Sequence, residues 1–281
     1  MEEQVVLDLI HTKRKLWKRG SGRNLYTLIK PELNRHNIKM GRDKLFTFLK
    51  DHDLQMKSKK KVVKTTNSYH FYHRYPNLIK ELTPIRANGV WVSDITYVWI
   101  RDLDNYAYLF LITDLYSRKV MGYNLSHSLK AEGAIMALKM AIRNAGKANL
   151  DGCIHHSDRG IQYCCYDYTA LLKKTGISIS MTENSDPLEN AVAERINRTI
   201  KDEFTHEKQM SFESLDKAKS SIKSIIDFYN NIRPHSSIER YTPAKAYGMY
   251  GKLNRMWKNY YKVKTNADLQ YVGDFFRHNC S

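Results

Sequence analysis

Three acidic residues stand in three different local contexts of this 281-residue chain, and they constrain its fold more than any other feature. Asp94 lies inside the apolar run WVSDITYV, Asp158 ends the segment HHSD, and Glu194 lies in the stretch ENAVAERIN. Thirty-five residues separate the second acid from the third. Carboxylates that converge from two strands and a helix are suitable ligands for a pair of Mg²⁺ ions. We therefore expect a fold that gathers these acids at one site.

The first acid is expected on the inward face of a strand. Side chains alternate between the two faces of a strand, so Asp94 shares its face with Val92 and Thr96. A carboxylate on a face that packs against helices is costly unless it is paired or binds a metal ion. Asp158 follows a short strand whose end should lie beside the first strand, where both acids would share a cation.

The order of the expected elements gives the fold class. Strands are predicted where apolar residues alternate between turns, and helices where apolar residues recur every three or four positions. The predicted strands are 90–100, 106–113, 119–127, 152–156 and 177–181, and the predicted helices are 131–146, 166–175, 189–207 and 211–231. Three consecutive strands followed by alternating helix and strand indicate an α/β fold with a mixed sheet flanked by helices. This order resembles the ribonuclease-H-like fold.

The charge of the chain is positive and unevenly distributed. The formal net charge is +17, the isoelectric point is about 9.6, and residues 1–85 alone carry +11. This surplus favours nucleic acid as the partner over a role in solubility or at a membrane surface. The sequence has no apolar run of the length that a membrane span needs. Four cysteines without a CxxC pair favour a reduced, cytosolic protein.

The basic N-terminal region is expected to form a small helical domain. Apolar residues recur at helical spacing over 25–33, where Pro31 is expected to kink the helix or delay its start. A turn over 37–40 leads to a second helix, on which Arg42 and Lys44 would face DNA. Two short helices with a tight turn and a basic second helix favour a helix-turn-helix, with an ordinary helical hairpin as the alternative.

A run of basic residues, KSKKKVVK, follows this region. Lys59, Lys60 and Lys61 would line a path for DNA phosphates, and a solvated linker is an equally good interpretation. The expected domains are a helix-turn-helix DNA-binding region (1–62), a linker (63–86), a ribonuclease-H-like catalytic core (87–248) and a basic, aromatic C-terminal tail (249–281).

The third acid is expected on a helix that also carries DNA contacts. At about 100° per residue, Asn190, Glu194, Arg198 and Lys201 form one stripe of the predicted helix. In this interpretation Glu194 holds metal, and the two cations hold DNA phosphate.

Each acid also has an ordinary interpretation when it is considered singly. Asp94 would accept a hydrogen bond at a strand edge, Asp158 would cap a turn, and Glu194 would form a surface pair four residues along its helix. Among the other polar residues, Asp114 is expected to cap the turn after the second strand, and His155 is expected to pack at a strand end. Jointly, the residue types and their element order favour the catalytic interpretation of the three acids.

Five blocks of the sequence carry a resemblance to a known family. They are WVSDITYV, TDLYSRKVMGY, HHSDRGIQY, SMTENSDPLENAVAERINRTIKDE and FYNNIRPHSSIERYTPAKAY. Through them nearly the whole chain resembles the insertion-sequence transposases of family three, in their second-frame (OrfB) product, within the retroviral-integrase superfamily. Residues 22–54 are similar to the helix-turn-helix of that product, and the position of Pro31 departs from it.

The resemblance implies that Asp94, Asp158 and Glu194 are the catalytic triad and that Lys201 contacts donor DNA. Asp94 and Asp158 would hold one Mg²⁺, and one of them with Glu194 would hold a second, with Mn²⁺ as a substitute. The enzyme would nick the 3′ end of the element, and the freed 3′-hydroxyl would attack another phosphodiester, in a copy-out, paste-in route through a circular intermediate.

The resemblance also implies partners and a place of action. The chain would bind insertion-sequence ends and target DNA as a homo-oligomer, in the bacterial cytoplasm at the nucleoid. A first-frame (OrfA) product, fused upstream by ribosomal frameshifting, would supply a leucine zipper, since no heptad run occurs here.

Two alternatives of other classes remain open at this point. A nuclease of the same fold, acting on RNA–DNA hybrids or junctions, would share the acids without strand transfer or a helix-turn-helix. A non-catalytic DNA-binding regulator would keep the fold, and substitution of Asp94 or Glu194 would leave its biological activity unchanged.

Overall fold

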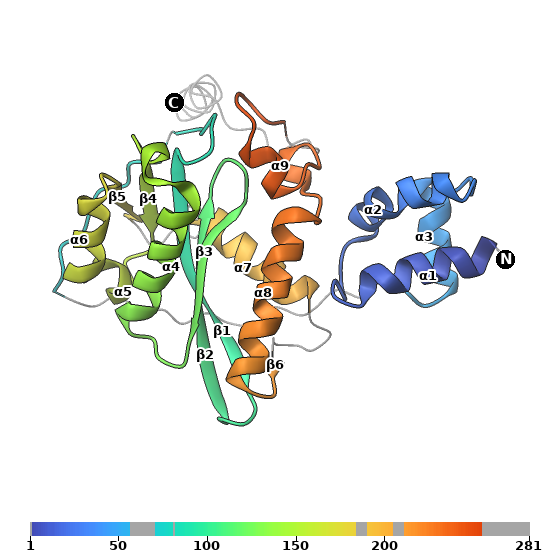
Figure 1. Ribbon diagram of the computed structural model, residues 1–281, viewed down its shortest axis with the longest axis horizontal. Coiled ribbons are helices and arrows are strands. Elements are labelled where there is room, and N and C mark those ends of the chain that lie inside the picture. Colours follow the sequence, from blue (N-terminus) through green and yellow to red (C-terminus); the bar gives the residue numbers. More distant parts are fainter. Residues whose placement is uncertain (1, 57–70, 81, 184–189, 205–210, 255–281) are drawn as a thin grey trace, which may run out of the picture.

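The structure, a computed structural model, describes residues 2–56, 71–80, 82–183, 190–204 and 211–254. Within these residues, a small helical body at the N-terminus stands beside a larger body built on a mixed sheet (Figure 1). No helix in the described ranges is both long enough and apolar enough to cross a lipid bilayer.

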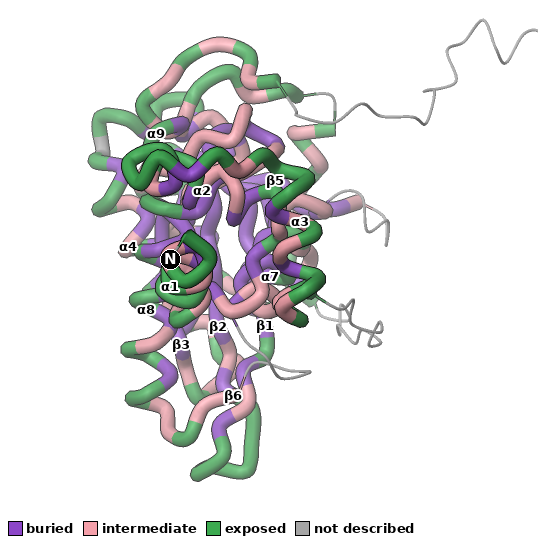
Figure 2. The backbone as a smooth tube through the Cα atoms, turned by 90° about the vertical axis from the view of Figure 1, so that its right-hand side faces the viewer, coloured by how far each residue is buried: buried purple, intermediate pink, exposed green. Residues whose placement is uncertain are grey.

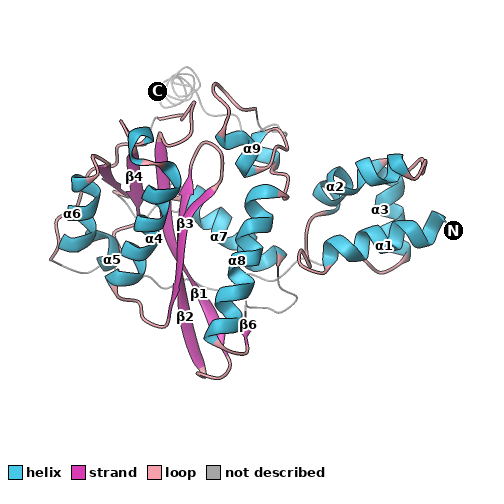
Figure 3. Ribbon diagram, in the orientation of Figure 1, coloured by secondary structure: helices cyan, strands magenta, loops and turns pink. Residues whose placement is uncertain are grey.

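One sheet forms the centre of the larger body. Its strands follow the order β3-β2-β1-β4-β5, and β6 pairs with the far end of β1. The first three strands form an antiparallel meander, whereas β4 and β5 run parallel to β1 (Figure 3). This arrangement confirms the predicted ribonuclease-H-like mixed sheet. The strands are β1 (Val90–Ile100), β2 (Asn105–Asp114), β3 (Val120–Ser126), β4 (Ile154–Ser157), β5 (Ser178–Met181) and β6 (Ser211–Phe212).

Helices cover both faces of this sheet. Trp91 and Phe110 belong to the apolar core under α4, α5 and α6, whereas Val98 and Leu109 belong to the core under α7 and α8. Figure 2 shows buried residues along the strands between these two layers. The helices are α4 (Ala131–Ala145), α5 (Ile161–Cys164), α6 (Tyr166–Lys174), α7 (Ala191–Glu203), α8 (Leu215–Asn231) and α9 (Pro243–Tyr247), with short 3-10 helices at Lys147–Asn149 and Ser236–Ile238.

The predicted boundaries agree with the structure except around the last two long helices. The predicted helix over 211–231 begins only at Leu215, because Ser214 caps it and accepts a hydrogen bond from the Lys217 backbone N–H at 3.3 Å. The two residues at the start of the predicted range form β6 instead. Of the predicted helix over 189–207, α7 covers 191–203, and the end of the prediction lies outside the described residues.

Three helices form the N-terminal body, namely α1 (Glu2–Arg14), α2 (Gly22–Arg35) and α3 (Arg42–Asp51). The turn predicted over 37–40 separates α2 from α3, and Asn37 takes the left-handed conformation there with φ of 53°. Helix α1 was not predicted from the sequence, because only Val6 and Ile10 are buried on it and such a narrow apolar stripe gives little signal.

The expectation that Pro31 delays the start of α2 was wrong, whereas the alternative that Pro31 kinks the helix stays a prediction. The helix begins at Gly22, where Ser21 caps it, and continues through Pro31 to Arg35. Pro31 is exposed on the solvent side, whereas Leu25, Ile29 and Leu33 are buried against α1 and α3. Burial of this stripe therefore outweighs the hydrogen bond that the proline nitrogen does not donate.

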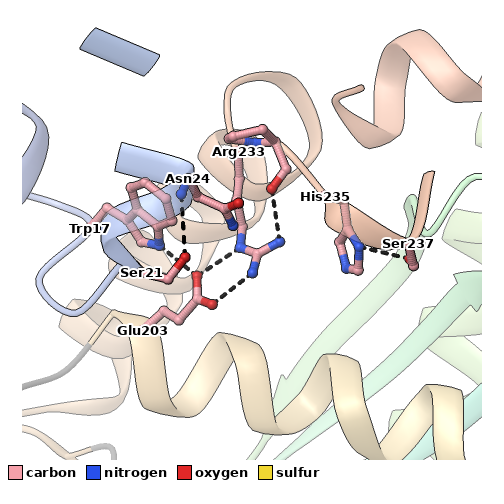
Figure 4. A network of polar contacts seen from close by, with 8 residues as sticks. Trp17, Ser21, Asn24, Glu203, Arg233, His235 and Ser237 are labelled. Carbon is pink, nitrogen blue, oxygen red and sulfur yellow. Dashed lines mark hydrogen bonds and ion pairs between the residues drawn. The ribbon is translucent and has the colours of Figure 1, made fainter. Parts of the chain in front are cut away.

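A buried ion pair of the sheet body, between Glu203 and Arg233, is also where the segment between α1 and α2 is attached (Figure 4). Glu203, the last residue of α7, accepts hydrogen bonds from the Arg233 guanidinium at 2.6 and 2.7 Å, and from the Trp17 indole at 2.6 Å. The backbone N–H of Arg19 donates to the Glu203 carbonyl at 2.7 Å. Trp17 is fully buried against Phe228 of α8, so the segment between α1 and α2 is part of the main core.

Removing one partner of this pair is predicted to be costly. Arg233→Ala should lower the free energy of unfolding by about 3–5 kcal/mol, because it leaves the Glu203 carboxylate buried without its partner. Urea unfolding followed by tryptophan fluorescence would measure the loss. The control is Arg35→Ala, which removes an exposed pair with Glu32 and should cost less than about 1 kcal/mol. Equal losses in the two variants would contradict this assignment.

Candidate active site

Asp94 lies in the middle of β1, the central strand, on the face that α7 covers. One carboxylate oxygen accepts a hydrogen bond from the Ile95 backbone N–H at 2.9 Å, and the other accepts one from the Asn197 side-chain amide at 2.8 Å. Val92, on the same face, packs against Ala193 of α7, as the alternation predicted. The side chain is therefore partly enclosed and held from two sides.

Asp158 directly follows β4, the parallel neighbour of β1. Val92 pairs with His156, so Asp94 and Asp158 each lie two residues further along adjacent strands. Neighbouring strands lie about 4.8 Å apart, so the two acids lie next to each other. The Gly160 backbone N–H donates to the Asp158 carboxylate at 3.0 Å and fixes the loop that leaves the strand.

Glu194 lies in the first turn of α7. Asn190 begins this helix, and its carbonyl accepts the backbone hydrogen bond of Glu194 at 3.2 Å. The Asn190 side-chain amide donates to the Ser93 carbonyl at 3.1 Å, next to Asp94 in the chain. The start of the helix is thereby attached to the strand that carries the first acid.

The negative charges of Asp158 and Glu194 both act on the carboxyl group of Asp94. Burial raises the pKa of Asp94 to about 7, and the negative charge of Asp158 is the next largest cause. The charge of Glu194 raises this pKa further, while the Asn197 amide and the Ile95 N–H act in the opposite direction. A cation placed among the carboxylates would remove this mutual repulsion.

The donor set fits a hard divalent cation such as Mg²⁺. Such an ion takes oxygen ligands, keeps several waters, and is usually held by one or two carboxylates with the substrate phosphates. In the described part of the chain, no three His, Cys, Asp or Glu side chains are drawn together tightly enough to enclose a metal ion alone. Nearby, the buried amide oxygens of Asn190 and Asn197 have no hydrogen-bond partner among the described residues. The site is therefore rich in oxygen acceptors.

The residue of α7 that contacts Asp94 is Asn197, which the predicted stripe did not include. Asn197 donates to Asp94, whereas Arg198 is exposed and donates to Asp202 at 3.3 Å. Three and seven residues after Glu194, Asn197 and Lys201 lie on one helical face with it. Burial lowers the pKa of Lys201, and the charges of Asp202 and Asp94 oppose that shift. Lys201 is therefore close enough to Asp94 to sense its charge.

The predicted DNA contacts have different surroundings. Arg42 and Lys44 are exposed at the start of α3, where Arg42 also pairs with Asp43 at 2.8 Å. Asn190 is buried, and its side-chain amide donates a hydrogen bond to the Ser93 carbonyl of β1. Its side chain therefore also holds the start of α7 on the sheet. Lys59, Lys60 and Lys61 lie outside the described residues.

A buried polar cluster supports the strand beneath the acids. The hydroxyls of Ser93 and Tyr168 lie 2.7 and 2.8 Å from Nε2 of His155. Burial and the neighbouring His156 lower the pKa of His155 to about 3, so its ring is neutral. His155 thus packs at the strand end as predicted. Asp114 accepts from the backbone and hydroxyl of Ser117, which confirms its turn role.

The chain is similar in sequence to a known domain family and to proteins of insertion elements. The integrase core domain family matches residues 84–187 and again 175–243. The chain is 36% identical to the insertion element IS600 uncharacterized 31 kDa protein of Shigella sonnei, over 80% of this chain and 81% of that protein. It is 35% identical to transposase InsF for insertion sequence IS3A of Escherichia coli K12, over 53% of this chain and 50% of that protein. Among solved structures, it is similar to the HTLV-2 integrase catalytic core domain in complex with magnesium, with a TM-score of 0.42 and 16% identity, over 58% of this chain and 97% of that one.

Removing the first acid is predicted to stabilise the metal-free protein at alkaline pH. The folded pKa is about 7 and the unfolded value about 3.9, so the wild type loses stability as the pH rises from about 4 to 7. Asp94→Asn does not titrate there, and it should raise the free energy of unfolding at pH 8 by about 1–3 kcal/mol.

Urea unfolding in EDTA at pH 8 and at pH 4 would measure this difference. The gain should nearly disappear at pH 4, where the wild-type carboxyl is protonated in the folded state. Asp216→Asn, at a side chain that is 94% exposed, is the control and should change little at either pH. A gain for Asp94→Asn that is the same at both pH values would contradict the raised pKa.

Proposed function

Because the chain belongs to the insertion-sequence transposases that carry an integrase core domain, we propose that Asp94, Asp158 and Glu194 catalyse metal-dependent DNA strand transfer. The observation that carries this proposal is the common electrostatic field of three acids from β1, the end of β4 and the start of α7. No basic side chain donates to Asp94, whose described partners are an amide and a backbone N–H. A bound metal cation would supply the positive charge that the described partners of Asp94 lack, and this would explain the carboxylate at this position.

The acids would hold two Mg²⁺ ions, for which Mn²⁺ would substitute. Asp94 and Asp158, at the same level of adjacent strands, would share one ion, and Glu194 with one of them would hold the other. When bound, the ions would activate the attacking oxygen and stabilise the leaving oxygen of a phosphodiester.

Residues around the acids would position them and the DNA. Asn197 holds one Asp94 oxygen at 2.8 Å and leaves the remaining lone pairs of the carboxylate for a cation. Asn190 fixes the start of α7 on β1, which sets the place of Glu194. Lys201, half-buried on the same helical face, would hold a DNA phosphate beside the acids.

The same residues would serve two successive reactions. Water would first attack the phosphodiester at the 3′ end of the element, and the freed 3′-hydroxyl would then attack another phosphodiester. Both are in-line displacements at phosphorus that need no covalent intermediate with the protein.

The same proposal includes the DNA-binding residues, the oligomeric state, the partner and the place of action. The exposed cations Arg42 and Lys44 on α3, with Arg198 on α7, would bind the DNA backbone of the insertion-sequence ends and target. The chain would act as a homo-oligomer that brings two DNA ends together, with a first-frame (OrfA) product as a partner or fusion, at the nucleoid in the bacterial cytoplasm.

A strand-transfer assay with labelled insertion-sequence ends in Mg²⁺ or Mn²⁺ tests the proposal. Asp158→Asn and Glu194→Gln should each abolish joined products, because each removes a charged metal ligand while keeping the shape of the side chain. Asp216→Asn, on the exposed surface of α8, should keep full activity.

Other outcomes of this assay would select another function. Nicking without joining, lost in both variants, would indicate a nuclease of the same fold. DNA binding without cleavage, unchanged by either substitution, would indicate a regulator and contradict the catalytic role of the acids.

A second prediction concerns the amide that holds Asp94. Asn197→Ala should raise the Mg²⁺ concentration for half-maximal strand transfer by about tenfold to a hundredfold, since residues that orient metal ligands contribute about that much to metal affinity or activity. A magnesium titration of the initial rate would measure it. Asn231→Ala, at an exposed residue of α8, is the matched control. The same half-maximal concentration in both variants would show that Asn197 has no such role.

A further inference from the structure

A hollow of about 860 Å³ opens beside the acids. It lies between the start of α7, the turn after β2, and the described residues of segments 77–80, 82–84 and 252–254, and its wall includes Val92 and Asn190. Val92 precedes Asp94 by two residues on the same strand face, so this wall is about 7 Å along the strand from the acid. Pockets of about 300–1,000 Å³ are the usual size for one small ligand. The hollow therefore has room for a group attached to the substrate of the acids.

The charged residues of this hollow favour an anion. Lys80, Arg118 and Lys252 line it, and none of its described lining residues is acidic. Lys80 lies 3.8 Å from Glu183, and Arg118 donates to the Ser237 hydroxyl at 3.3 Å. Lys252 is exposed at the rim, in reach of an approaching phosphate. The local surplus of positive charge thus complements a phosphodiester chain.

The remainder of the hollow suits a flat, partly polar group. Ile79, Leu82 and Val192 give it apolar walls. Tyr116 and Asn190 are 4% and 5% exposed, and within the described residues the Tyr116 hydroxyl and the Asn190 amide oxygen have no hydrogen-bond partner. Buried polar atoms without partners are unfavourable, so such atoms indicate a ligand with donors or acceptors at its edge. A nucleobase combines this edge with faces that apolar side chains accept.

We propose that this hollow is a subsite for one unpaired nucleotide of the DNA strand on which the acids act. Its phosphate would lie at Lys252 and Lys80, and its base would enter between the apolar walls to reach Tyr116 and Asn190. The inference rests on the proposed function for the identity of this strand.

Binding of DNA with a fluorescent base tests the subsite without catalysis. A duplex that ends in a short unpaired strand would carry 2-aminopurine in that strand, and the measurement would be made in EDTA. The wild-type protein should raise the 2-aminopurine fluorescence, because a base in an aliphatic pocket is no longer stacked on its neighbours. A fully paired duplex with the same base should give no such rise.

Two substitutions locate the effect in the hollow. Tyr116→Phe removes only the hydroxyl and should weaken binding of the unpaired-end DNA about threefold to tenfold, the usual effect of one hydrogen bond. Lys252→Gln should reduce the slope of log affinity against log salt by about 0.7, the value for one phosphate of a single strand. Tyr166→Phe and Lys174→Gln, at exposed positions on α6, are the matched controls and should behave like the wild type.

Three results would overturn the subsite. They are the absence of a fluorescence rise, variants that match their controls, and competition by free deoxyadenosine monophosphate as strong as by the oligonucleotide. The wild-type protein could also show the fluorescence rise and both variant effects but no strand transfer. That result would contradict the proposed function and would leave the subsite supported.

Discussion

The candidate site is organised around a carboxylate on the inward face of the central strand, Asp94 of β1. Asp94 raises the free energy of the folded state because burial and two neighbouring acids disfavour its charge, which is why its pKa rises to about 7. The surrounding fold keeps it there: β4 runs parallel beside β1 and ends one residue before Asp158, and α7 crosses the same face with Glu194 in its first turn. Each element therefore contributes one acid to the site.

The helix that carries the third acid is fixed at both ends. At its start, Asn190 donates to the backbone of β1 at 3.1 Å, and at its end Glu203 is held by Arg233 and Trp17. Glu203 follows Glu194 by nine positions, which places the two residues about 13 Å apart along the axis and on opposite sides of the helix. The hydrogen bond from Trp17 to Glu203 attaches the end of α7 to the segment between α1 and α2. DNA bound by the N-terminal body would consequently be held at a defined place relative to the acids.

Much of this architecture could be predicted from sequence because its signals are local. The strands from β1 to β5 could be predicted from alternating apolar residues and from short apolar runs. The parallel pairing of β1 with β4 then brings Asp94 level with Asp158. What could not be predicted depends on contacts between distant residues. Helical spacing alone allowed Arg198 toward the site, and only packing shows that Asn197 reaches Asp94 while Arg198 pairs with Asp202. Trp17 stood in a basic segment, and its burial requires Phe228 and Glu203, far along the chain. The continuation of α2 through Pro31 likewise depends on tertiary burial of Leu25, Ile29 and Leu33.

Anomalous diffraction from crystals soaked in Mn²⁺ tests whether the three acids form a cation site. An anomalous peak is expected between the carboxylates of Asp94 and Asp158, within reach of Glu194, and no such peak is expected in Asp94→Asn crystals soaked in the same way. Wild-type crystals in which Mn²⁺ occupies other surface sites while this position stays empty would contradict such a site.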